Sequence, residues 1–123
     1  MTYDVIAVTR ELPDRRSLVA GMLVAGEHLR VREDAGSGIV QLCADDGTAL
    51  VRLDSPILVR VPGEIDRLLG PGHGERLGLP VWWVEAHAPG GRPEAARLAR
   101  RFAAEAVRRL SGVVWPPLPE EHR

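Results

Sequence analysis

Residues 29–54 read LRVREDAGSGIVQLCADDGTALVRLD, and this stretch decides the fold class. Three short runs rich in β-forming residues, Leu29–Glu33, Ile39–Ala44 and Thr48–Asp54, are separated by turns that contain glycine and aspartate. Such spacing is typical of strands joined by hairpins. Connections this short predict antiparallel neighbours, because parallel strands need a crossover of a dozen residues or more.

The turn at Asp46-Gly47 predicts the register of the second hairpin. Asp-Gly is favoured in a type I′ turn, in which both central residues have positive φ. A turn at this place pairs six apolar residues across the strands, namely Val40 with Leu53, Leu42 with Val51 and Ala44 with Ala49. These side chains share one face because side chains alternate along a strand. The sequence therefore predicts a three-stranded meander with one core-facing side.

The patterns around the meander predict further strands and three helices. Strands are expected at 3–9, 57–61, 81–87 and 113–115, and helices at 15–28, 62–69 and 93–110. The last helix repeats apolar residues at intervals of three and four, whereas the first is apolar nearly all round, with Asp14 as its N-cap. Together these elements predict an α+β two-layer sandwich, in which a mostly antiparallel sheet, with a central three- to four-stranded meander, carries helices on one face. If the final strand-helix-strand is a crossover, it adds a local parallel pairing.

Length and composition limit the functional classes. The 123 residues suit one domain, taken as residues 1–117 with a loose C-terminal tail at 118–123. The formal net charge of −1 gives no overall attraction to nucleic acid or membrane, and no apolar run approaches the ~20 residues of a membrane span. A single cysteine and an N-terminus unlike a signal peptide favour the cytoplasm.

All 16 basic residues are arginine, and asparagine is missing as well. Lysine and asparagine have AT-rich codons, so this bias is typical of a GC-rich bacterial genome. The placement of the arginines is therefore more informative than their number.

The outer face of the predicted meander is the first candidate site. If the apolar face packs on the core, the residues pointing away are Arg30, Arg32, Gln41, Cys43, Leu50 and Arg52, with Arg60 as an extension. Clustered guanidinium groups can bind an anion, but the face lacks the aromatic residues with which sheets stack single-stranded bases. The alternative is a solvated face whose arginines pair with Glu33 and Asp54. Cys43 is either a thiolate near these arginines or, more often for this residue type, a small buried side chain.

Trp83, Glu85 and His87 share one face of the strand at 81–87 and form a second candidate site. A carboxylate beside an imidazole can act in acid–base chemistry or bind a metal. His73, in the glycine-rich loop at 70–80, could add a ligand, but two ligands do not make a zinc site. The alternative is a surface strand with one ion pair. No catalytic residue, metal or cofactor is assigned, because no hydrolase, metalloprotease or paired-cysteine motif occurs.

The third candidate is an interface at Met22, Trp82, Trp83 and Trp115. Trp82 and Trp83 are adjacent, so they point to opposite faces of a strand, and one of them needs cover from a loop or a partner. Exposed tryptophan often anchors interfaces. The sequence thus favours a non-catalytic binding or assembly module that forms a homodimer. The alternatives are a small-molecule-binding or hydrolytic domain at the second site, and an anion or nucleic-acid binder at the first.

Overall fold

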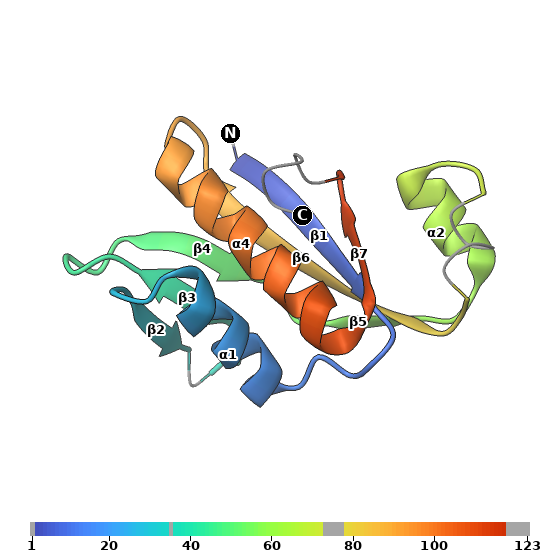
Figure 1. The fold of residues 1–123 in the computed structure, drawn as a ribbon, viewed down its shortest axis with the longest axis horizontal. Helices are drawn as coiled ribbons and strands as arrows, with labels where there is room; N and C mark the ends of the chain where they lie inside the picture. Colours follow the sequence, from blue (N-terminus) through green and yellow to red (C-terminus); the bar gives the residue numbers. More distant parts are fainter. Residues whose placement is uncertain (1, 35, 73–77, 118–123) are drawn as a thin grey trace.

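A computed structural model of the chain describes residues 2–34, 36–72 and 78–117. Its strands are β1 (Thr2–Thr9), β2 (Arg30–Glu33), β3 (Val40–Cys43), β4 (Ala49–Leu53), β5 (Ile57–Val59), β6 (Val81–Pro89) and β7 (Gly112–Trp115). Its helices are α1 (Arg15–Ala25), α2 (Pro62–Leu69) and α4 (Pro93–Leu110). The predicted α+β class is confirmed (Figure 1).

The strands form one seven-stranded sheet in the order β2-β3-β4-β6-β1-β7, with β5 also paired to β6. Every described strand pair is antiparallel. β1 lies between β6 and β7, so the crossover through α4 joins two strands that are not neighbours. The expected local parallel pairing of β6 with β7 is therefore wrong, because β1 lies between these two strands.

Two helices, α1 and α4, pack side by side on one face of the sheet (Figure 1). Phe102 of α4 is fully buried in the core beneath them. Gly21 of α1 allows the two helices to approach closely, since a Cβ there would lie 3.1 Å from the Phe102 ring. The predicted N-cap is present: Asp14 Oδ1 accepts a hydrogen bond from the Ser17 backbone N–H at 2.8 Å.

The first helix is shorter and less buried than its sequence predicts. It ends at Ala25, where the Gly26 N–H donates to the Met22 carbonyl. Leu23 and Val24 stay 49% and 47% exposed on the side away from the sheet. A two-layer domain covers only one side of a surface helix, so an all-round apolar helix leaves part of its surface in solvent.

Helix α2 lies at one end of the sheet (Figure 1). It packs on the face opposite to α1 and α4. Its Ile65 and Leu69 pack with Val8 and Trp83 in a second, smaller apolar cluster. The prediction of helices on one face thus describes α1 and α4, and α2 adds cover on the opposite face. We call the apolar residues that pack with α2, namely Val8, Val59, Ile65, Leu69, Val81 and Trp83, the α2 cluster. We call the part of the opposite face that α2 does not cover the outer face.

The meander register is confirmed in its middle and wrong at its turn. Leu42 pairs with Val51 and Val40 with Leu53 as predicted. Cys43, rather than Ala44, pairs with Ala49, because a bulge shifts the register. Gly47 alone in this turn has positive φ, at 88°, and its N–H donates to the Ala44 carbonyl, so the turn is not type I′.

The bulge changes which side chains reach the outer face. Leu50 is the extra residue on β4, and it turns into the core. Cys43 is also buried. The expectation that Leu50 points outward with the arginines is therefore wrong. Cys43 pairs with Arg30, so the register keeps it on the outer face, where it is buried rather than exposed. Among the described helices, none combines the length and apolarity that crossing a bilayer requires.

Candidate functional site

The outer face carries polar side chains in one line across five strands. Arg32 of β2 pairs with Gln41 of β3, Gln41 with Arg52 of β4, Arg52 with His87 of β6, and His87 with Asp4 of β1. Directly paired residues of neighbouring strands point to the same face. We call these five residues the polar row. It is basic at the β2 end and acidic around His87.

His87 lies between two carboxylates. Its Nδ1 is 2.6 Å from Asp4 Oδ1, and its Nε2 is 2.8 Å from Asp54 Oδ2. Glu85 Oε2 is 3.5 Å from the same Nε2. The His87 side chain is only 16% exposed. A neutral imidazole has one N–H, so donating to both aspartates requires the doubly protonated ring.

The electrostatics favour this charged form. Burial lowers the pKa of His87, but the hydrogen bonds with Asp4 and Asp54 outweigh it and raise the pKa above its ordinary value. The same hydrogen bond from His87 holds the pKa of Asp4 below its usual value. An imidazolium with both nitrogens engaged has no lone pair with which to accept a proton. The arrangement therefore does not favour His87 as a general base.

Glu85 is held in place by Trp83. The indole Nε1 donates to Glu85 Oε1 at 2.9 Å. Trp83 is 5% exposed and packs in the α2 cluster, so the position of its indole N–H is fixed by the surrounding side chains. Asp54, directly after β4, donates its backbone N–H to the Glu85 carbonyl at 3.0 Å. Its Oδ1 is 3.9 Å from Arg52 Nη2.

The structure brings Trp83, Glu85 and His87 of the second candidate site together on one face of β6. The remaining candidate, His73, lies outside the described residues. Asp4 is not among the site residues predicted from the sequence, and Asp54 is predicted only as an ion-pair partner of the arginines. Asp54, Glu85 and His87 bring three potential ligand atoms within 4.8 Å of one another.

The arginine face is partly assembled. Arg32, Gln41 and Arg52 lie in the polar row, and Arg30 lies two residues from Arg32 on the same side of β2. Within the described chain, neither Arg30 nor Arg32 has a carboxylate oxygen within 4.0 Å of a guanidinium nitrogen. Of the pairs expected between these arginines and Glu33 or Asp54, the described chain contains the one between Arg52 and Asp54.

Glu33, the other expected partner of these arginines, forms an ion pair with Arg15.

Arg60 does not belong to this face. Val59 pairs with Val81, which places the next residue about seven positions along β6 from His87, roughly 23 Å away. Val59 also faces the α2 cluster, so alternation directs Arg60 to the other side of the sheet. Its inclusion is wrong because β5 extends the sheet beyond β4 along β6.

The predicted interface loses two of its members. Met22 is fully buried in the main core, and Trp83 is buried beneath α2. Trp82 and Trp115 are half-buried, and Trp115 packs against the α2 cluster. Of the two adjacent tryptophans, Trp83 is covered by α2 of the same chain, and Trp82 on the opposite face stays half-buried.

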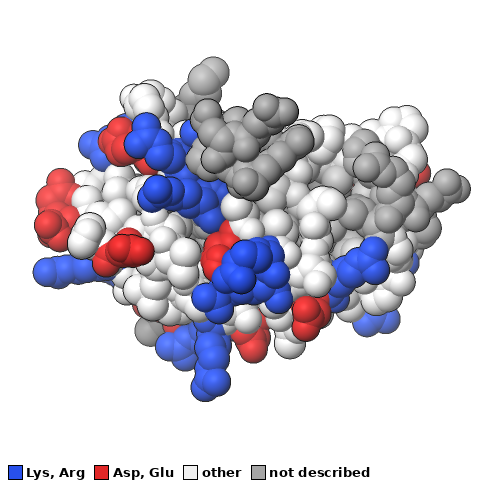
Figure 2. All heavy atoms as spheres, viewed as in Figure 1, with Lys and Arg blue, Asp and Glu red and all other residues white. Residues whose placement is uncertain are grey.

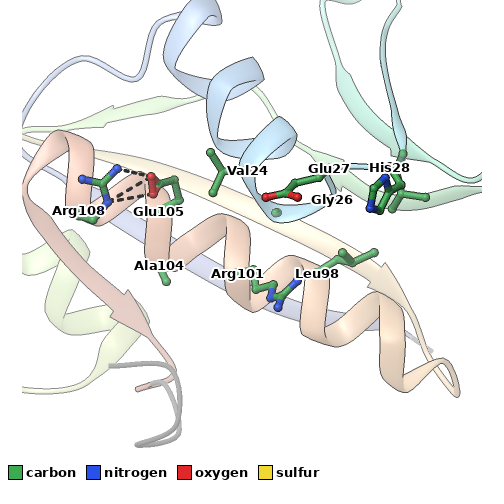
Figure 3. A pocket seen from close by; sticks show the side chains of 11 residues that line it. Val24, Gly26, Glu27, His28, Leu98, Arg101, Ala104, Glu105 and Arg108 are labelled. Atoms are coloured by element: carbon green, nitrogen blue, oxygen red, sulfur yellow. Dashed lines mark hydrogen bonds and ion pairs between the residues drawn. The ribbon is translucent and has the colours of Figure 1, made fainter.

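The helical face also has a hollow, and one of the carboxylates in its wall is already ion-paired. An open groove of about 990 Å³ lies between the end of α1 and α4, bordered by Val24, Leu98 and Arg101 (Figure 3). Glu105 in its wall is bound by Arg108 and Arg109, and Arg108 lowers the pKa of Glu105. Arginines and carboxylates are interspersed over this face (Figure 2). Glu105 is therefore held within the helical surface rather than directed into the groove as a free carboxylate.

Comparisons with protein-family models, with curated proteins and with solved structures find no match for this chain. Function has to be inferred from the chemistry of the polar row.

Proposed function

We propose that the protein is a non-catalytic binding module that takes a small anionic ligand at the basic end of the polar row. The observation that carries this proposal is the register that sets Arg32, Gln41 and Arg52 side by side on the face opposite to α1 and α4. Arg30 adjoins them, and within the described chain neither it nor Arg32 forms an ion pair within 4.0 Å, although Asp34 interacts electrostatically with Arg32.

The spacing of these groups fits a small ligand. Neighbouring strands are about 4.8 Å apart, so Arg32 and Arg52 start about 10 Å apart with the Gln41 amide between them. Arginine binds carboxylate and phosphate oxygens through paired N–H groups. A ligand with two or three anionic oxygens at each end, such as pyrophosphate or a tricarboxylate, matches this span.

The acidic end of the row argues against nucleic acid. Asp4, Asp54 and Glu85 lie within two strands of Arg52 and would repel a continuing phosphate backbone. Trp83 is buried, so it offers no stacking surface for a base. The composition favours a bacterial, cytoplasmic setting, in which small phosphorylated and carboxylated molecules are abundant.

The test is a calorimetric titration with inorganic pyrophosphate and with citrate. Arg32→Gln and Arg52→Gln are each expected to weaken binding about tenfold or more, because a charge-assisted hydrogen bond is worth about 1.5–3 kcal/mol. Arg60→Gln is the matched control and should leave binding unchanged, since Arg60 lies off the row. Binding should weaken with salt. Equal loss in the Arg60 variant, or no binding of either anion to the wild type, would contradict the proposal.

Self-association is the second candidate, and the exposed Leu23 and Val24 of α1 favour it. Adjacent apolar side chains on a helix surface are a common dimer contact. We expect light scattering to show a dimer that Leu23→Glu converts to a monomer. Leu68→Glu, at an equally exposed leucine of α2, should stay dimeric. A wild-type monomer at high concentration would rule this candidate out.

A further inference from the structure

Three side chains at the acidic end of the polar row converge on one point. His87 Nε2 is 2.8 Å from Asp54 Oδ2 and 3.5 Å from Glu85 Oε2. Ligand atoms 2.0–2.2 Å from a cation lie about 3.0–3.6 Å from one another in octahedral or tetrahedral geometry. We propose that Asp54, Glu85 and His87 form a binding site for a divalent first-row transition cation.

The surroundings of these ligands support the proposal independently of their spacing. A histidine that binds metal through one nitrogen usually donates its other N–H to a carboxylate, which fixes the tautomer and the ring orientation. Asp4 Oδ1 occupies that position, 2.6 Å from His87 Nδ1. Nε2 is thereby directed at the two remaining carboxylates, and a cation bound there replaces the proton that Nε2 otherwise donates to Asp54. Asp4 is a positioning residue for the metal-binding nitrogen.

Glu85 has an outer partner of the same kind. Trp83 Nε1 donates to Oε1 of Glu85, while Oε2 is the oxygen that approaches His87. The indole is buried under α2, so it fixes which carboxylate oxygen faces the site. Backbone pairing between Asp54 and Glu85 holds the third ligand at the same level of the sheet.

The donor set indicates the class of cation. One imidazole and two carboxylates combine ligands preferred by zinc, iron and nickel with ligands preferred by manganese. Calcium takes six to eight oxygens, and magnesium is bound mainly through carboxylates, water and substrate phosphates. The Glu85 and Asp54 side chains are 35% and 45% exposed, so the site is open on one side. Three protein ligands leave coordination positions there for solvent or a bound molecule.

This inference does not depend on the proposed anion site, because no ligand is shared. An anion held by Arg52 would nevertheless lie close enough to complete the coordination of the cation. The two proposals can fail separately. Metal binding is therefore measured without any polyvalent anion, and anion binding with protein and buffer freed of metal on a chelating resin, because a dissolved polycarboxylate chelator would itself compete for the arginines.

The experiment titrates chelator-treated wild-type protein with Zn²⁺ by calorimetry and with Co²⁺ by visible absorption. One ion per chain is expected, and millimolar Mg²⁺ or Ca²⁺ should not displace it. His87→Gln and Glu85→Gln are expected to remove binding, and Asp4→Asn to weaken it 10- to 100-fold. His28→Gln, at an exposed histidine on the helical side, is the matched control and should bind as the wild type does.

A second measurement needs no variant and so does not depend on how the substitutions fold. Substoichiometric Mn²⁺ should broaden the backbone amide signals of residues around Asp4, Asp54 and 85–87. Broadening centred elsewhere would overturn the proposal. So would wild-type protein that binds none of these ions, or binding that survives Glu85→Gln and is lost with His28→Gln.

Discussion

The contact between Gly21 and Phe102 gives a prediction whose sign depends on the background. Gly21 faces the Phe102 ring across the α1–α4 contact, and a Cβ added there would lie 3.1 Å from both Cδ1 and Cε1. Phe102 is fully buried, so the ring has little room to withdraw. Gly21→Ala therefore sets a gain in helix propensity against an overlap in the core.

The size of both effects can be estimated. Replacing glycine by alanine inside a helix stabilises by about 1 kcal/mol, whereas forcing an extra carbon into a packed core costs about 1–3 kcal/mol. We expect Gly21→Ala to lower the free energy of unfolding by up to about 2 kcal/mol in the wild type. In a Phe102→Val background both Cδ1 and Cε1 are gone, and the same substitution should raise the free energy of unfolding by up to about 1 kcal/mol.

The assay is urea denaturation of wild type, both single variants and the double variant. The expected coupling between the sites is about 1–3 kcal/mol, with an unchanged dependence on urea concentration. Additivity of the two substitutions within about 0.5 kcal/mol would refute the reasoning. It would mean that α1 and α4 move apart readily, so that Gly21 does not set their separation.

Three further predictions concern the sheet, a helix end and the site. Gly112→Ala should destabilise by about 3 kcal/mol or more in thermal unfolding, because its Cβ would lie 1.8 Å from the Val8 carbonyl oxygen and force β7 off β1; an unchanged melting temperature would contradict the β1–β7 pairing. Asp14→Ala should lower the melting temperature while Asp14→Asn keeps it, since an amide oxygen can still accept from the Ser17 N–H; equal loss in both variants would show that the cap does not act through this bond. The pKa of His87 is raised in the folded chain, so in chelator its stabilising effect is complete below the unfolded pKa near 6.5 and is lost as pH rises through the folded value; denaturation between pH 6 and 9 should show this fall in the wild type, and a His87→Gln variant with the same slope would disprove its origin.

The middle of the meander could be predicted from sequence because alternation leaves one register with an apolar face. The turn could not. Asp46-Gly47 satisfies a type I′ turn, but it also suits a turn in which glycine alone has positive φ, followed by a bulge. The two turns differ in whether one residue of the second strand is paired across the hairpin or left out of the pairing by the bulge. That residue, Leu50, enters the core in the structure.

Half of the candidate site could be predicted for a similar reason. Glu85 and His87 are two residues apart on one strand, so alternation alone places them together. The partners of His87 are 83 and 33 positions away, at Asp4 and Asp54. Their proximity follows from the order of the strands, and local patterns do not encode which strand lies beside which. The error over Trp83 has the same source, since α2 covers a face that a two-layer arrangement leaves open.

The position of the site on the outer face follows from where two neighbouring strands change character. On β6 the outward residues run from Val81 and Trp83 to Glu85 and His87, and on β1 they run from Val8 and Ile6 to Asp4. In the antiparallel register of the structure, the apolar ends of the two strands lie side by side beneath α2, whereas a shift by two residues would set the Asp4 carboxylate opposite that of Glu85. That register pairs Val8 with Trp83, and it then necessarily pairs Asp4 with His87. The register in which Val8 and Trp83 pack beneath α2 therefore also brings Asp4 within hydrogen-bonding distance of His87. Once the order of the strands is known, the change from apolar to polar residues along β1 and β6 accounts for the contact between Asp4 and His87.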